Sequence, residues 1–177
     1  MFRRLQTDFQ LGIVLIYGFC AAGLISAFAV YRFLTGSLPG ALLDLFLVLS
    51  ISSMVIYGWR SGKTELAGKC LVVLNVIGTT LSTILLGGTG LYWVFVALSV
   101  NFFLTRSIGY AITTNIAMLL AILYFSPNFP NAVSQWTFLS TGALLTLLSA
   151  LVSRQNGLQR KRLQYLATID PLTGELL

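Results

Sequence analysis

The chain has 177 residues, of which 56% are hydrophobic and only 9% are charged. Because a soluble domain carries about 25% charged residues, this composition and a mean hydropathy of +0.87 exclude a soluble globular domain. The formal net charge of +6 comes from 11 Lys and Arg residues against 5 acids. His is absent and the two cysteines lack CxxC spacing, so the sequence predicts neither a metal site nor a His-dependent catalytic set.

The first apolar run covers residues 11–33 and follows a basic start, as a signal peptide would. A signal-peptide core has about 7–15 residues, however, whereas about 20 apolar residues are needed to span a bilayer. We therefore interpret this run as a retained transmembrane helix.

Five further apolar runs follow, separated by Gly, Pro or charged residues. The six expected spans cover about residues 11–33, 41–57, 66–86, 91–104, 108–125 and 134–151. The fourth would be only about 21 Å long, against about 30 Å for the hydrocarbon core. It could instead form a re-entrant pair with the fifth, which would leave four spans. We expect an all-α membrane protein whose six-helix bundle occupies residues 1–152.

The positive charges are distributed unevenly between the two sides of this predicted bundle. With six spans, ten of the 11 Lys and Arg residues fall on one side and only Arg32 falls on the other. Cytoplasmic loops carry the excess of Lys and Arg. We therefore expect both termini in the cytoplasm and membrane lipids as partners. The basic tail is interpreted as a topology signal, not as a nucleic-acid-binding segment.

Asp44 is the ionisable residue that the predicted second span carries into the membrane. Such groups are costly in lipid and are more often functional than structural. Three interpretations are open for Asp44: an interfacial carboxylate in contact with water, the partner of Arg32, or part of an outward-facing pocket. For the pocket, the neighbouring candidates are Tyr92 and Trp93, because a carboxylate beside aromatic rings can hold a small polar or cationic ligand.

Three asparagines, Asn75, Asn101 and Asn115, lie within the third, fourth and fifth predicted spans. Asparagine side chains in membranes mainly form hydrogen bonds between helices, and we expect that role here. Asn101 is also a candidate for the ligand pocket, although its position is nearer the inner side.

The sixth span continues into a basic segment, residues 153–169, in which Gly157 permits either a continuous helix or a soft joint. Residues at near-heptad spacing make up a candidate seam: Leu151, Leu158, Arg162, Tyr165 and Ile169. This spacing favours a short parallel coiled coil in a homodimer. An amphipathic helix on the membrane surface is the alternative. Pro171 is expected to end the segment.

The last residues carry a motif. It is made up of Leu163, Ala167, Asp170, Leu172, Thr173 and Gly174. These residues resemble the L-x-x-x-A-x-x-D-x-L-T-G opening of GGDEF domains, the diguanylate cyclases of bacteria. The resemblance implies that residues 170–177 begin such a domain and join it to the helical stalk. The family's usual Asn-Arg continuation is replaced here by Glu175-Leu176-Leu177, and the GGDEF loop is absent, so no catalytic residue can be assigned.

The resemblance implies a sensory and dimerisation module in the bacterial inner membrane that regulates a C-terminal diguanylate cyclase. That domain would use Mg²⁺ to convert two GTP molecules into cyclic di-GMP. A ligand or lipid bound in the bundle would be the signal. An alternative keeps this architecture but gives the missing domain a receptor role. The other alternative is a stand-alone six-span protein, a small transporter or assembly scaffold, with a basic cytoplasmic tail.

Overall fold

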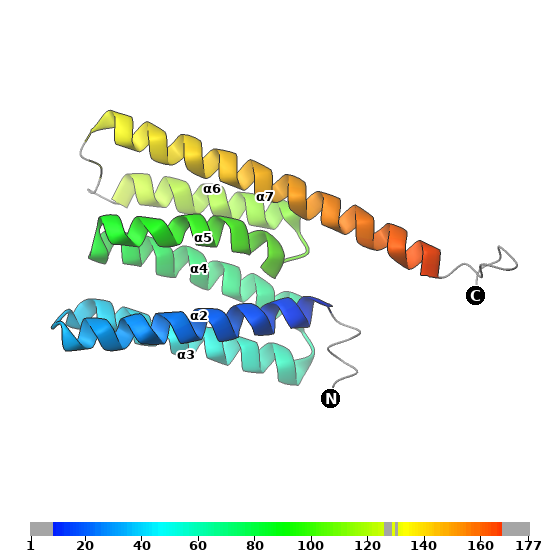
Figure 1. Ribbon diagram of the computed structural model, residues 1–177, viewed down its shortest axis with the longest axis horizontal. Coiled ribbons are helices and arrows are strands. Elements are labelled where there is room, and N and C mark those ends of the chain that lie inside the picture. Colours follow the sequence, from blue (N-terminus) through cyan, green and yellow to red (C-terminus); the bar gives the residue numbers. More distant parts are fainter. Residues whose placement is uncertain (1–8, 126–128, 130, 168–177) are drawn as a thin grey trace, which may run out of the picture.

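A computed structural model describes residues 9–125, 129 and 131–167, with side chains described up to residue 159 (Figure 1). Within this part of the chain all regular structure is helical. The elements are α2 (Phe9–Leu34), α3 (Leu38–Ser61), α4 (Thr64–Leu86), α5 (Gly88–Leu104), α6 (Ile108–Phe125) and α7 (Ala132–Ala167). The predicted all-α class is confirmed.

Five of these helices are long and apolar enough to cross a membrane, namely α2, α3, α4, α6 and α7. The chain is therefore a multi-pass membrane protein by length and composition. Helix α5 is also apolar, but its 17 residues give a length of about 26 Å, a little less than the hydrocarbon core. A sixth crossing by α5 stays a prediction.

Helices α3 and α5 each begin three residues before their predicted spans. Helix α3 begins at Leu38 because Pro39 fits the first helical turn, where its missing N–H is not needed. Its end is set by Gly62, which has a φ of 71° and whose N–H donates to the carbonyl of Gly58. Helix α5 begins at Gly88, three residues before the predicted start, directly after Gly87 with a φ of 65°.

Successive helices run antiparallel, so the first described residues and the C-terminal half of α7 lie at the same end of the bundle (Figure 1). We call this the near end, and we call the end with the α2–α3 and α4–α5 connections the far end. Helix α4 is central and packs against α2, α3, α5 and α6. Helix α7 packs against α5 and α6.

The helices approach closely where glycine removes a side chain. A Cβ added to Gly68 would lie 1.9 Å from the Leu104 carbonyl oxygen, and one added to Gly90 would lie 2.4 Å from the Ser82 carbonyl oxygen. Small residues at such contacts permit tight packing in membranes. They place α5 directly against α4, which positions the polar groups described below.

Helix α7 runs without interruption through Gly157 and projects beyond the bundle at the near end (Figure 1). The continuous helix, and not the soft joint, is therefore observed. Leu151 and Leu158 of the predicted seam are exposed. Arg162 and Tyr165 lie in α7 beyond the described side chains, while Ile169 lies outside the described residues. The same holds for Asp170, Leu172, Thr173 and Gly174, so coiled-coil pairing and the domain start stay predictions.

Candidate functional site

An ion pair joins the last turn of α2 to the second turn of α3. Arg32 Nη1 donates a hydrogen bond to Asp44 Oδ2, and the two side chains are only 13% and 5% exposed. Of the three interpretations of Asp44, pairing with Arg32 is therefore observed, and contact with bulk water is not. Gly40 leaves room for the pair, since a Cβ there would lie 3.1 Å from Arg32 Cδ. Burying both charges is expensive, so the pair is a candidate functional feature.

A cavity of about 240 Å³ adjoins this ion pair. Arg32 and Asp44 are part of its wall, which is otherwise mainly apolar and comes from α2, α3, α4 and α5. Aromatic rings lie near the ion pair: Phe28 meets Trp93 edge to face with centroids 5.7 Å apart, and the Arg32 guanidinium lies 5.7 Å from the Phe28 ring centroid. We call this space the far-end cavity.

The structure brings only some of the predicted pocket residues together. Asp44 and Trp93 line the far-end cavity. Tyr92 does not, because consecutive helical residues point about 100° apart, and its side chain is 73% exposed. Asn101 is fully buried but lies behind the wall, in the polar chain described next.

A chain of hydrogen bonds crosses the middle of the bundle. Tyr17 on α2 donates to Asn75 Oδ1 on α4, and Asn75 Nδ2 donates to Asn101 Oδ1 on α5 at 3.0 Å. Asn101 Nδ2 donates to Asn115 Oδ1 on α6 at 2.9 Å, and Asn115 Nδ2 donates to the Leu98 carbonyl at 2.8 Å. The predicted role of the three asparagines in joining helices is thus observed. Their chain starts at the cavity wall, since Tyr17 and Asn75 line it.

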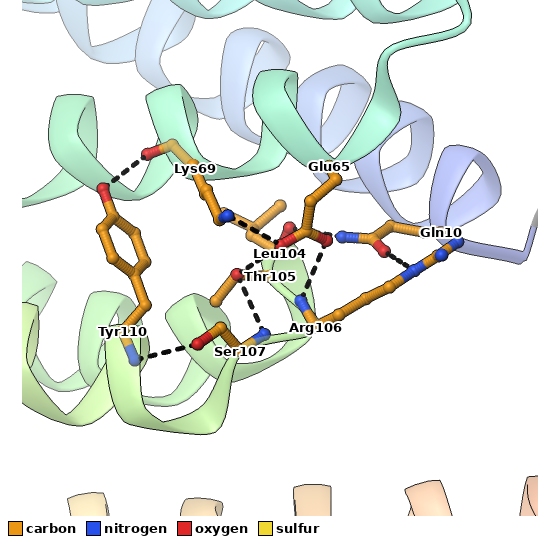
Figure 2. Close-up of polar contacts among 8 residues, drawn as sticks. All are labelled: Gln10, Glu65, Lys69, Leu104, Thr105, Arg106, Ser107 and Tyr110. Atoms are coloured by element: carbon orange, nitrogen blue, oxygen red, sulfur yellow. Dashed lines mark hydrogen bonds and ion pairs between the residues drawn. The ribbon is translucent and has the colours of Figure 1, made fainter.

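A second polar cluster holds the near end together, and Figure 2 shows its residues converging from α2, α4 and the α5–α6 connection. Glu65 is at its centre, accepting from Thr105 Oγ1 at 3.1 Å and from the Arg106 backbone N–H at 3.2 Å. Arg106 Nε donates to Gln10 Oε1 at 2.5 Å, and Gln10 Nε2 donates to the Leu104 carbonyl at 2.9 Å. We call these contacts the near-end cluster.

Sequence reasoning did not single out Tyr17, Gln10 or Glu65. A tyrosine in an apolar span and a glutamine at its start carry no distinguishing local pattern. Only Glu65 had a weak indication of a structural role in the sequence, because it is an acid among several basic residues, Arg60, Lys63 and Lys69, on one predicted side of the membrane. Its true partners, Thr105 and the Arg106 backbone, are 40 and 41 residues away and become visible only after folding.

The site features of the described residues are a cavity and polar contacts between helices. The described residues contain no group of three or more His, Cys, Asp and Glu side chains that could hold a metal ion. What they offer is a cavity with the Arg32–Asp44 pair in its wall and, elsewhere in the same wall, Tyr17 and Asn75, which begin the hydrogen-bond chain that reaches α6. Comparisons with protein-family models, with curated proteins and with solved structures find no match to this chain.

Proposed function

We propose that this chain is the transmembrane sensory and dimerisation module of a signalling protein. The observation that best supports this proposal is the length of α7, which is one uninterrupted helix of 36 residues, Ala132–Ala167. At about 1.5 Å per residue it is about 54 Å long, well beyond the bilayer's hydrocarbon core. A helix that is packed in a membrane bundle at one end and free of it at the other can carry a movement to a soluble domain.

The attached domain that we propose is a diguanylate cyclase, because residues 163–174 resemble the opening of GGDEF domains. Such an enzyme would need Mg²⁺ and GTP, and two copies would have to meet, which the proposed homodimer provides. The proposed location is the bacterial inner membrane. The near end would face the cytoplasm, because Arg60, Lys63, Lys69, Arg106 and Arg154 are at that end and Arg32 is at the other.

The proposed mechanism is a shift between two arrangements of α7. A ligand in the far-end cavity can change their balance only by its difference in affinity for the two. Helix α5 contacts both the cavity and α7. Its Trp93 lines the cavity, and its Phe102 carbonyl accepts a hydrogen bond from Ser153 Oγ of α7 at 3.4 Å. A change in the cavity would therefore reach the helix that leaves the membrane.

The test uses the protein encoded by the whole natural reading frame, in a bacterial host without its own cyclic di-GMP synthesis. We expect cyclic di-GMP to accumulate and its level to change with membrane composition. Replacing residues 1–152 by an unrelated dimeric coiled coil should make the level constant. Equal responses from both proteins would contradict a sensory role. No product, with a reading frame that ends at Leu177, would instead favour the stand-alone transporter or scaffold.

A second experiment tests transmission through α7. Inserting one alanine after Gln155 turns everything beyond it by about 100°, whereas inserting seven residues restores nearly the same face. We expect the first insertion to change cyclic di-GMP output and the second to preserve it. Equal output from both proteins would show that the orientation of α7 does not matter.

A further inference from the structure

The shape of the far-end cavity restricts what can occupy it. On α3 the lining runs from Asp44 to Ile51 and on α5 from Trp93 to Val100, which corresponds to about 10 Å of helix in each case. On α2 it continues from Tyr17 to Arg32, about 22 Å of helix. A volume of about 240 Å³ spread over such a length is a narrow slot along the helices. An extended hydrocarbon chain fits a slot of this kind better than a broad ring system does.

The slot is accessible from the side of the bundle. Leu24 on α2 and Val96 on α5 both line it, yet they are 57% and 51% exposed. In a membrane-embedded bundle these residues face the hydrocarbon region. An occupant would therefore enter from the bilayer, with its long axis parallel to the surrounding lipid chains.

The charge at one end of the slot selects the head of the occupant. Arg32 and Asp44 neutralise each other, so a charged head group beside them would lack a counter-charge in a medium of low dielectric constant. A neutral head avoids that penalty. The guanidinium has five N–H donors, of which the bond to Asp44 uses one, and a carboxylate has several acceptor sites. A hydroxyl group could use both a donor and an acceptor there.

We propose that the far-end cavity binds a neutral single-chain amphiphile, with a hydroxyl head at the Arg32–Asp44 pair and its hydrocarbon chain along α2. This inference deepens the proposed sensory function by naming the chemical class of its ligand. Its test measures occupancy of the cavity and not cyclase output, so either proposal can fail while the other holds.

The two cysteines provide the measurement. Cys20 lines the far-end cavity, whereas Cys70 lines a separate groove that includes Phe46 and Tyr110, and both thiols are free. The full chain in phosphatidylcholine nanodiscs is treated with a membrane-permeant maleimide, and the rate at each cysteine is followed by mass spectrometry. The probes are oleyl alcohol, oleate and the hydrocarbon octadecene.

We expect oleyl alcohol to slow labelling of Cys20 and to leave Cys70 unchanged. It should act at a roughly tenfold lower concentration than octadecene, because that ratio of affinities corresponds to the free energy of about one hydrogen bond to a charged group. Oleate should be weaker than the alcohol. Equal potency of alcohol and hydrocarbon, stronger protection by oleate, or equal slowing at both cysteines would each overturn the proposal.

A charge change sharpens the test. Asp44→Asn gives the site a net charge of +1, so the preference should switch from oleyl alcohol to oleate. Glu65→Gln removes the same charge at the near-end cluster and should leave the preference for the alcohol intact. If Asp44→Asn does not fold, the neutral double variant Arg32→Gln/Asp44→Asn is used instead. It should still bind oleyl alcohol in preference to oleate. Unchanged preference in Asp44→Asn, or a switch in the double variant or in Glu65→Gln, would contradict the inference.

A steric change tests the location. Ala97 lines the cavity, whereas Ala117 on α6 is exposed away from it. Ala97→Leu should abolish protection of Cys20 by oleyl alcohol, and the matched Ala117→Leu should leave it unchanged. Full protection in a folded Ala97→Leu protein would place the ligand elsewhere.

Discussion

At the far end of the bundle, a buried ion pair joins α2 to α3 beside the far-end cavity, whereas at the near end several hydrogen bonds join α2, α4 and the α5–α6 connection. Asp44 is the ion-pair partner of Arg32, whose guanidinium otherwise lies against the Phe28 ring, so loss of either charged residue leaves an uncompensated charge in the membrane. Glu65 instead shares its carboxylate between the Thr105 hydroxyl and a backbone N–H. We therefore expect the near end to tolerate single losses better than the far end does.

The largest expected effect follows from breaking the far-end ion pair. Arg32→Met leaves Asp44 buried without its partner and should lower the free energy of unfolding by about 3–5 kcal/mol. Thermal unfolding in detergent, followed by circular dichroism, measures the loss. The double variant Arg32→Met/Asp44→Leu should recover much of it. Arg60→Met, at an exposed position, is the control. An equal loss in both single variants would show that burial of the pair is unimportant.

A smaller effect is expected where α4 meets α5. Gly68→Ala would place a methyl group against the Leu104 carbonyl, which is backbone and cannot move away cheaply. Overpacking of this kind costs about 1–3 kcal/mol. Gly23→Ala is the matched control, since a Cβ at Gly23 would have no neighbour within 4 Å. It should be neutral or slightly stabilising in the same unfolding measurement, and a loss as large as that of Gly68→Ala would refute the contact.

The hydrogen-bond chain in the middle of the bundle should contribute about 1–2 kcal/mol. Asn101→Leu removes both a donor and an acceptor, which leaves Asn75 and Asn115 each without one bond. Ser53→Ala is the comparison, because the Ser53 hydroxyl bonds only within its own helix, to the Leu49 carbonyl. Equal thermal stability of the two variants would indicate that the chain does not hold the helices together.

The smallest effect is expected at the edge of the near-end cluster. The Lys69–Glu65 ion pair has a separation of 3.5 Å, with side chains 41% and 34% exposed. Exposed pairs of this type contribute at most about 1 kcal/mol. Lys69→Gln should therefore change thermal stability little, while Glu65→Ala should cost more because it removes the acceptor of two further bonds. A larger loss from Lys69→Gln would reverse the proposed order within the cluster.

The helices could be predicted from the sequence because apolar runs and their Gly, Pro and charged interruptions are local features. The Arg32–Asp44 pair was also accessible, since a short connection brings the end of one predicted span near the start of the next. The first residues of the helices were harder to predict. Pro39 is a residue that usually interrupts helices, but the first turn of a helix accepts proline, and α3 begins one residue before it.

A pocket at Asp44 and Trp93 was one of the interpretations open from the sequence, but the extent of the cavity could not be predicted, because it depends on how side chains from four helices fail to fill a shared space. Tyr92 and Trp93 show the limit of local reasoning. Both are aromatic and adjacent, but the helical rotation between them directs only Trp93 to the cavity. The partners of Glu65 were hidden for a different reason, since the contact joins the first turn of α4 to the α5–α6 connection, about 40 residues away in sequence.

The short length of α5 has a consequence for the membrane itself. A helix of about 26 Å is slightly mismatched to a hydrocarbon core of about 30 Å, and mismatch costs fractions of a kcal/mol per Å. Its neighbours α4 and α2, with 23 and 26 residues, carry no such deficit. In the predicted six-span arrangement, a change in bilayer thickness would act most directly on the two shortest helices, α6 with 18 residues and α5 with 17. Of these, α5 carries Trp93, Asn101 and the Phe102 carbonyl bonded to α7. In the proposed mechanism, α5 would respond to bilayer thickness and pass the change to α7 through the Phe102–Ser153 contact.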